Sequence, residues 1–300
     1  MLLPNVRSWL GFGPAAGAEK PARPRDLGLN VDEHPVPPTP ATENSNWSPH
    51  RLEVVDSLWG KGFQFPGGEA ETLHLAKPLG LSSASSLLLV GAGSGGPPCA
   101  IANKLGVWVT GFESDPGLVL AATERSIRVG LARRAQIENW DPAHPNFERN
   151  QFHHGMALEP LREAAAEPTL AALAQALKPG GQLVLTETVA DAVLDPADPV
   201  IASWRRLEKR RAEPLPSEIS ITRVLGRLGF DVRIVEDVSQ RHIRQALFGW
   251  RQVVRGMEHA PPSPRDAAQL VQEAEMWLLR MKLLRARTLR LVRWNAIARG

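Results

Sequence analysis

The chain has 300 residues, of which 43% are hydrophobic, and a formal net charge of only +3. This length and composition suffice for one large domain or two modest ones with a buried core. The small charge surplus gives no indication of nucleic acid, and no such partner is predicted. The single cysteine, Cys99, excludes an internal disulfide framework and favours a reducing compartment. We therefore predict a cytoplasmic protein in which the Cys99 side chain packs its helix against the rest of the fold.

The first 50 residues are rich in proline and poor in apolar clusters. Such a segment cannot bury enough surface to offset the entropy lost on ordering, so we interpret residues 1–50 as a flexible tail and residues 51–300 as one folded domain. The opening residues lack the continuous apolar core of a signal peptide, and no apolar stretch of about eighteen residues predicts a membrane span. The short 6–12 patch is either a sticky part of the tail or a peripheral contact with a partner or membrane surface.

From residue 51 onward the sequence alternates between strand and helix patterns. The predicted strands, separated mostly by helical patterns, are 86–91, 106–112, 134–139, 151–157, 181–187 and 230–236. This alternation predicts an α/β fold with a doubly wound parallel sheet that is covered by helices on both faces. In such sheets the ligand binds beyond the carboxyl ends of the central strands.

The last part of the chain predicts a long helix followed by a strand. Ser263 and Pro264 give a helix start, and apolar residues at helical spacing continue to Met281. Residues 288–298 have the pattern of a strand. We predict that this strand forms an antiparallel hairpin with 230–236 at the end of the sheet, which leaves residues 240–284 as an inserted helical cap.

The most informative motif is a glycine-rich turn after the first predicted strand. Gly91-Ala92-Gly93-Ser94-Gly95-Gly96 follows Val90, and Glu113 closes the next predicted strand. Glycine allows a tight bend and a close approach of a ligand to the backbone, and a carboxylate on the next strand suits the two hydroxyls of a ribose. The motif predicts a nucleotide-binding βαβ unit. The same glycines satisfy G-x-G-x-x-G, so a nicotinamide-dependent oxidoreductase is one alternative.

A second motif distinguishes between these alternatives. The run from Leu177 to Glu187, which contains Lys-Pro-Gly-Gly, joins a predicted helix end to a buried strand. Together with the glycine turn it resembles the class I S-adenosylmethionine-dependent methyltransferases, and the resemblance extends from about residue 51 to the C-terminus. It implies their Rossmann-like, seven-stranded, mostly parallel sheet with a reversed terminal hairpin, and S-adenosyl-L-methionine as the cofactor.

Flanking segments resemble the phosphoethanolamine methyltransferase subgroup more closely. The stretch from Trp59 to Thr72 is similar to the segment that closes over the cofactor in that subgroup. The 211–230 region, the Glu236-Asp237 pair and the helix around Trp277 follow in the same order as in that subgroup.

The resemblance implies specific cofactor-binding residues. Glu113 would bind the ribose hydroxyls and Asp141 the adenine amino group, although each is alternatively a solvated acid. Trp140 either covers the adenine ring or belongs to the core. Leu89 replaces an acid that many of these enzymes carry before the first glycine. The turn residues placed under the methionine part of the cofactor are Gly91, Ala92, Gly93 and Gly95.

The predicted catalytic groups depart from the family pattern. The phosphoethanolamine enzymes use a Tyr and a His near the methyl group, whereas this chain has no Tyr and carries Val55 at the Tyr position. Glu159 and Glu163 occupy the stretch of the family's acid and His. Because they are spaced by one helical turn, both could face the pocket as general base and cation partner. Alternatively, Glu163 is an exposed helix acid.

His153 and His154 are further candidate bases. Adjacent residues on a strand point to opposite faces, so at most one could line the site, and a packed or edge position is the simpler interpretation. No metal site is predicted.

A phosphate-bearing substrate would require cations. Arg211 and Arg280 lie near the family's phosphate-binding positions, and a guanidinium can bind phosphate through two parallel hydrogen bonds. Glu213 stands where the family has a phosphate-contacting Tyr, which argues against phosphoethanolamine itself. The arginine-rich stretch from Arg280 to Arg299 is either a solvated face or a contact for anionic partners or lipid headgroups.

These patterns lead to two main hypotheses. In the first, the protein is an S-adenosylmethionine-dependent methyltransferase that acts on an N, O or C nucleophile of a small molecule held under the 240–284 cap. In the second, the same fold is a catalytically degenerate regulatory or scaffolding protein that binds S-adenosylmethionine, or binds no cofactor. The nicotinamide oxidoreductase is a third and weaker alternative.

Overall fold

The structure of the protein, a computed structural model, describes residues 45–211 and 214–299. The predicted tail up to residue 44, with its 6–12 patch, and Glu213 lie outside the described residues. Residues 45–48 contact the folded part, and the first described helix, α2, begins at Pro49. The described fold therefore starts before residue 51, earlier than the predicted boundary.

The core of the fold is one seven-stranded sheet in the order β3-β2-β1-β4-β5-β7-β6. Strands β3, β2, β1, β4 and β5 are parallel, whereas β7 is antiparallel to both of its neighbours. The predicted parallel sheet with a reversed terminal hairpin is thus confirmed. The strands are β1 Ser86–Val90, β2 Trp108–Glu113, β3 Ala135–Asn139, β4 Phe152–Leu158, β5 Leu177–Val189, β6 Phe230–Asp237 and β7 Arg290–Ala298.

One strand differs clearly from its prediction, since β5 begins at Leu177 instead of residue 181. Leu177 pairs with Phe152 and Gln182 pairs with His154, so the register shifts across the Lys-Pro-Gly-Gly segment. Gly180 has a φ of 75° in this irregularity, a backbone conformation that favours glycine. The turn-like composition therefore lies inside the strand.

Helices cover both faces of the sheet and one of its ends. They are α2 Pro49–Trp59, α3 Gly68–Ala76 with the short 3₁₀ helix η2 Lys77–Leu79, α4 Gly96–Leu105, α5 Pro116–Arg128, α6 Ala166–Ala176, α7 Pro199–Glu208, α8 Glu218–Arg227, α9 Ser239–His259 and α10 Pro264–Arg285. No helix in these ranges has the length and apolar character needed to cross a membrane.

The alternation of side chains along β1 explains why both faces are covered. Leu87 and Leu89 pack with residues of α3 and α4, whereas Leu88 and Val90 pack with residues of α6 and α8. All four side chains are fully buried, as expected for a central parallel strand. Cys99 is buried on α4 in the first of these two clusters, in agreement with its predicted packing role.

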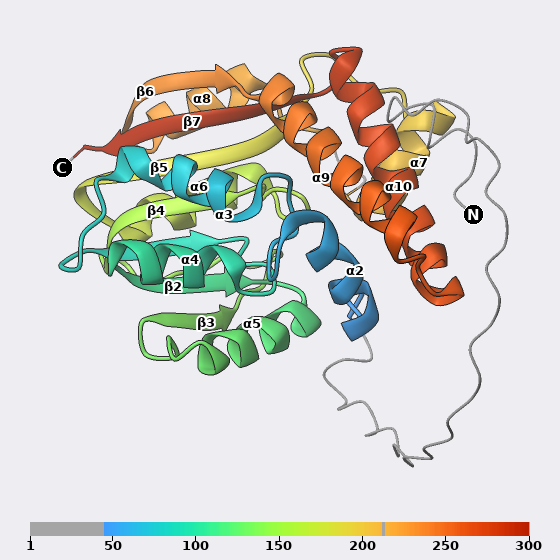
Figure 1. Ribbon diagram of the computed structural model, residues 1–300. Helices are drawn as coiled ribbons and strands as arrows, with labels where there is room; N and C mark the ends of the chain where they lie inside the picture. Colours follow the sequence, from blue (N-terminus) through green and yellow to red (C-terminus); the bar gives the residue numbers. More distant parts are fainter. Residues whose placement is uncertain (1–44, 212–213, 300) are drawn as a thin grey trace, which may run out of the picture.

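A separate hydrophobic cluster holds the cap beyond one end of the sheet. Helices α9 and α10 lie next to each other there, with α2 beside them (Figure 1). Trp59 of α2 meets Trp277 of α10 edge to face, with ring centroids 4.9 Å apart. The two cap helices occupy the chain between β6 and β7, the span for which we expected an inserted cap.

Candidate active site

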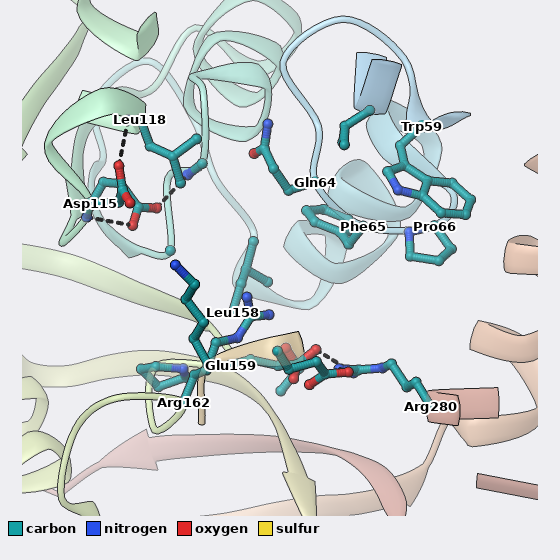
Figure 2. Close-up of a pocket in the computed structure, with 18 of the residues that line it drawn as sticks. Trp59, Gln64, Phe65, Pro66, Asp115, Leu118, Leu158, Glu159, Arg162 and Arg280 are labelled. Atoms are coloured by element: carbon teal, nitrogen blue, oxygen red, sulfur yellow. Dashed lines mark hydrogen bonds and ion pairs between the residues drawn. The ribbon is translucent and has the colours of Figure 1, made fainter. Parts of the chain in front are cut away.

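A pocket lies at the carboxyl ends of the central strands, between the sheet and the cap. One side is formed by residues that follow β1, β2 and β4, and the other by α2, the segment after it, α9 and α10. Figure 2 shows residues from these walls converging on the pocket: Asp115, Leu118, Leu158, Glu159, Gln64, Phe65, Trp59 and Arg280. This is the location that a doubly wound sheet predicts for its ligand.

Two of the four predicted turn residues line the pocket. Gly91 has a φ of 85° and Gly93 a φ of 58°, conformations that residues with a Cβ rarely adopt. Ala92 is fully buried beneath the turn, and Gly95 packs against Ala122 of α5, so neither is a lining residue. The backbone at Gly91 and Gly93 is therefore what the turn presents to a ligand.

Glu113 connects the end of β2 to this turn. Its Oε2 accepts a hydrogen bond of 2.8 Å from the Gly93 N–H, and its Oε1 accepts one of 2.8 Å from the Ser114 N–H. Burial raises the pKa of Glu113, while these backbone donors oppose the shift. Oε1 also accepts weaker bonds from Ser114 Oγ and the Asp115 N–H, whereas Oε2 has the Gly93 N–H as its one donor among the described residues. Glu113 lines the pocket, so its Oε2 can accept a further hydrogen bond from a ribose hydroxyl.

Gln64 covers the glycine turn, a role that the sequence did not reveal. Its Oε1 accepts from the Ser94 N–H at 2.9 Å, and its Nε2 donates to Ser94 Oγ at 2.7 Å. A Cβ built on Gly93 would lie 1.8 Å from Gln64 Oε1. The space above Gly93 is thus shared between the pocket and the end of a flexible side chain.

Trp140 and Asp141 have different positions. Trp140 is buried, lines the pocket and lies 5.8 Å from the Phe147 ring, so it serves the core and the site together. Asp141 is exposed and outside the pocket, in contrast to the expected contact with adenine. Its carboxylate accepts from the Ala143 N–H and pairs with His144 Nδ1, both at 2.8 Å, and the His144 bond lowers its pKa. The local turn captures the side chain.

Glu159 is the centre of a buried ion cluster. Its carboxylate bonds to Arg280 Nη2 at 2.6 Å and to Arg210 Nη2 at 2.5 Å, and it also accepts from Thr188 Oγ1. Burial would raise its pKa, but Arg280 and Arg210 outweigh burial and hold the pKa well below the usual range. A carboxylate held this way is a poor proton acceptor, which argues against the predicted role of Glu159 as general base.

The expected helical relation between Glu159 and Glu163 is wrong. Residues 159–164 form a turn, and α6 begins only at Ala166. Glu159 has a φ of 47° and precedes Pro160, which disfavours the right-handed helical conformation for the residue before it. Both carboxylates line the pocket, but Glu163 is exposed to solvent whereas Glu159 is held by two arginines.

The two predicted phosphate-binding arginines lie in different places. Arg280 lines the pocket, but its Nη1 is bound to both Glu208 oxygens at 3.0 Å and its Nη2 to Glu159. Arg211 lies outside the pocket and donates to the Glu163 carbonyl at 2.9 Å. The buried arginine of this segment is Arg210, one position earlier.

The remaining candidates are placed as follows. His153 Nδ1 contacts Ser86 and His154 Nδ1 accepts from the Gln182 N–H, so both are packed near the start of β4 and neither lines the pocket. Val55 is buried and lines the pocket. Leu89 is part of the core.

Several pocket residues come from segments without a recognisable motif. Glu208 and His242 line the pocket from the ends of α7 and α9. Burial and then Arg280 lower the pKa of His242 to about 3, so this imidazole is neutral. No spacing in the sequence connects these positions; only the apolar face of each helix indicated that the segment packs inward.

Comparisons with known proteins agree with this fold. No protein-family model matches the chain. Phosphoethanolamine N-methyltransferase 2 of Caenorhabditis elegans is 26% identical over 137 residues, which are 45% of this chain and 31% of that protein. Methyltransferase GfsG of Streptomyces halstedii is 26% identical over 176 residues, 58% of this chain and 63% of that protein. The chain thus spans about one third of the length of the Caenorhabditis elegans protein and somewhat under two thirds of the length of GfsG.

Solved structures show the same architecture. Phosphoethanolamine N-methyltransferase 2 of Haemonchus contortus, in complex with phosphomonomethylethanolamine and S-adenosylhomocysteine, has a TM-score of 0.71 at 19% identity over 83% of this chain and 57% of that chain. The [4+2]-cyclase SpnF has a TM-score of 0.61 at 19% identity over 83% of this chain and 94% of its own. By sequence and fold, the chain resembles the class I S-adenosylmethionine-dependent methyltransferases.

Proposed function

We propose that the protein is an S-adenosylmethionine-dependent methyltransferase acting on a small molecule. The observation that carries this proposal is the joint position of Gly91, Gly93 and Glu113 at the carboxyl ends of β1 and β2, on one wall of a pocket closed by a helical cap. Gly91 and Gly93 carry no side chains of their own, and the Glu113 carboxylate offers an acceptor for a ribose hydroxyl through its Oε2. The residues present fit an adenosyl cofactor.

The cofactor would supply an activated methyl group for an in-line displacement by the acceptor. For such a reaction the protein contributes mainly by holding the two reactants in line and excluding water. Val55, Trp59 and Trp277 are buried around the pocket, and their apolar surfaces exclude water. Of the two predicted catalytic carboxylates, Glu163 is the better suited to accept a proton, because Glu159 is engaged by two arginines.

The second candidate function is cofactor binding without methyl transfer. It is favoured by Val55 at the family's Tyr position and by Gln64 over the glycine turn. The similar fold of a [4+2]-cyclase also illustrates that this architecture is not tied to one reaction.

The test combines binding with product formation. Titration calorimetry with S-adenosylhomocysteine should give saturable binding that Glu113→Ala weakens by roughly 1.5 to 3 kcal/mol, the range for a charge-assisted hydrogen bond. Glu138→Ala, an exposed acid on the neighbouring strand β3, is the control and should leave the affinity unchanged. Incubation with a labelled methyl donor and a cell extract should yield a labelled small molecule. Binding without any labelled product would favour the second candidate.

A further inference from the structure

The cap side of the pocket contains three buried polar atoms that have no hydrogen-bond partner among the described residues. They are Nε2 of His242, Nε1 of Trp277 and Nε of Arg280. All three residues are more than nine-tenths buried, and all three line the same pocket. Buried polar groups in native proteins nearly always have a partner, so a cluster without one points to a ligand.

The three side chains form one group. Trp277 and Arg280 are three positions apart on α10 and therefore lie on the same face of that helix. The His242 ring centroid is 5.6 Å from that of Trp277, and the Arg280 guanidinium carbon is 5.8 Å from the Trp277 ring. The three side chains thus come together from α9 and α10 on the cap side of the pocket.

The kind of hydrogen bonding restricts what that group can be. Trp277 Nε1–H and Arg280 Nε–H can only donate. The neutral His242 ring can donate or accept through Nε2, depending on its tautomer. The ligand atom must accept from two donors, which an ammonium group cannot do. An oxygen satisfies all three atoms, and a hydroxyl can in addition donate its proton to His242.

The charges restrict the group further. Glu159 and Glu208 already neutralise Arg280 and Arg210, and Glu187 is bonded to Arg210 as well. The positive charge of Arg280 is therefore balanced within the protein, and a phosphate bound at its Nε would add negative charge next to Glu159 and Glu208. An uncharged oxygen adds no charge to the cluster.

We propose that His242, Trp277 and Arg280 bind the polar end of the methyl acceptor, and that this end is an uncharged oxygen, a hydroxyl or enol, rather than a phosphate. This inference rests on the proposed methyltransferase function. The other pocket walls near the cap include Val55, Phe65 and Met276, which suit an apolar body behind the hydroxyl.

The test compares matched probes on wild-type protein saturated with S-adenosylhomocysteine. The hydroxyl probes are phenol, cyclohexanol and 2-naphthol, and the charged probes are their phosphate esters, all titrated by calorimetry. We expect at least one hydroxyl probe to bind saturably and its phosphate ester to bind at least roughly tenfold more weakly. The inference is overturned if no hydroxyl probe binds or if an ester binds as tightly as its parent.

A pair of tryptophan variants assigns the effect to the cluster. Trp277→Phe keeps a ring but removes Nε1–H, and it should weaken the hydroxyl probe roughly tenfold. Trp250→Phe is the matched control, because Trp250 is equally buried and its Nε1 also lacks a partner in the described part of the chain, yet it does not line the pocket. Equal affinities in the two variants would refute the assignment.

Failure of this inference can be separated from failure of the proposed function. If wild-type protein does not bind S-adenosylhomocysteine, the proposed function falls and the acceptor site with it. If it binds the cofactor product but prefers phosphate esters, only the acceptor assignment is wrong.

Discussion

Glu159 shows how the environment of a single residue decides its role. Two guanidinium groups and a hydroxyl converge on one carboxylate that has little contact with solvent. Ion pairs of this kind are costly to break, because removal of one partner leaves a buried charge uncompensated. The carboxylate is therefore better suited to hold Arg210 and Arg280 in place than to exchange protons with a substrate.

The first prediction concerns this carboxylate. Glu159→Gln should lower the free energy of unfolding by about 3 kcal/mol, the cost of removing one partner from a buried ion pair. Glu163→Gln, an exposed acid four residues later, should change it by less than about 0.5 kcal/mol. Urea unfolding measures both. Similar values for the two variants would mean that the cluster does not stabilise the fold.

The second prediction concerns the pH dependence contributed by Glu187. Burial raises the pKa of this carboxyl to about 7, while Arg210 opposes and Glu159 reinforces the shift. Because the pKa is higher in the folded state than the ordinary value of 4.5, the stability from this group is fully present below that value. It is lost as the pH rises through about 7.

Unfolding experiments between these pH values test the assignment. The stability of Glu187→Gln should depend less on pH than that of the wild type over this interval, because the variant has no proton to lose at this position. Glu138→Gln, at an exposed site, should follow the wild-type curve. An unchanged slope in Glu187→Gln would show that Glu187 is already ionised in the folded protein.

At the scale of elements, residues 45–51 form a strap that joins the two sides of the pocket. Ser45 Oγ and the Asn46 N–H bind the carboxylate of Asp115 at the start of α5. Arg51 binds Glu273 of α10 at 2.6 Å and lies 4.0 Å from the centroid of the Trp47 ring. The strap thus links the half of the site that holds Glu113 to the cap.

The third prediction follows from this link. Arg51→Ala should release the strap and speed the dissociation of S-adenosylhomocysteine roughly fivefold, the effect of losing about 1 kcal/mol. Stopped-flow tryptophan fluorescence can measure the rate. Arg255→Ala, which removes an exposed arginine of α9, is the control. If both variants release the ligand at the wild-type rate, the strap does not hold the site closed.

The basic end of the chain is partly neutralised by neighbouring elements. Arg290 pairs with Asp191 and Glu218, and Arg293 pairs with Glu236. These ion pairs, together with the buried Arg280, favour the structural interpretation of the arginine-rich stretch over an anionic partner.

At the scale of the whole molecule, the sheet was predictable because its signals are local. The central strand β1 is a short apolar run, and the reversed hairpin followed from the order of a strand, a long helical segment and a final strand. The glycine turn and Glu113 were predictable for the same reason, since a motif and its partner lie on consecutive strands. The structure brings these residues together as expected.

The rest of the site was not predictable because it depends on tertiary contacts. His242, Glu208 and Arg210 meet only when α7, α9 and α10 fold over the sheet, and no sequence spacing specifies that meeting. Arg211 was the arginine predicted from the sequence, whereas the buried arginine is its neighbour Arg210. Outside a predicted helix or strand, the sequence does not show which of two adjacent side chains points into the protein. Asp141 was misplaced because its own turn binds the carboxylate.

The central claim is that the backbone at Gly93 is part of the cofactor site, and one titration tests it most directly. Gly93→Ala and Gly130→Ala both add a side chain at a positive φ, 58° and 73°, and at Gly93 the new Cβ also displaces the end of the flexible Gln64 side chain. Of these two glycines, Gly93 lines the pocket and Gly130 does not; a Cβ on Gly130 would meet no other atom of the described residues within 4 Å.

In a calorimetric titration with S-adenosylhomocysteine, the wild type and Gly130→Ala should bind with affinities that agree within about twofold, and Gly93→Ala should bind at least roughly tenfold more weakly. Equal affinities for Gly93→Ala and Gly130→Ala, or no binding by the wild type, would contradict the account.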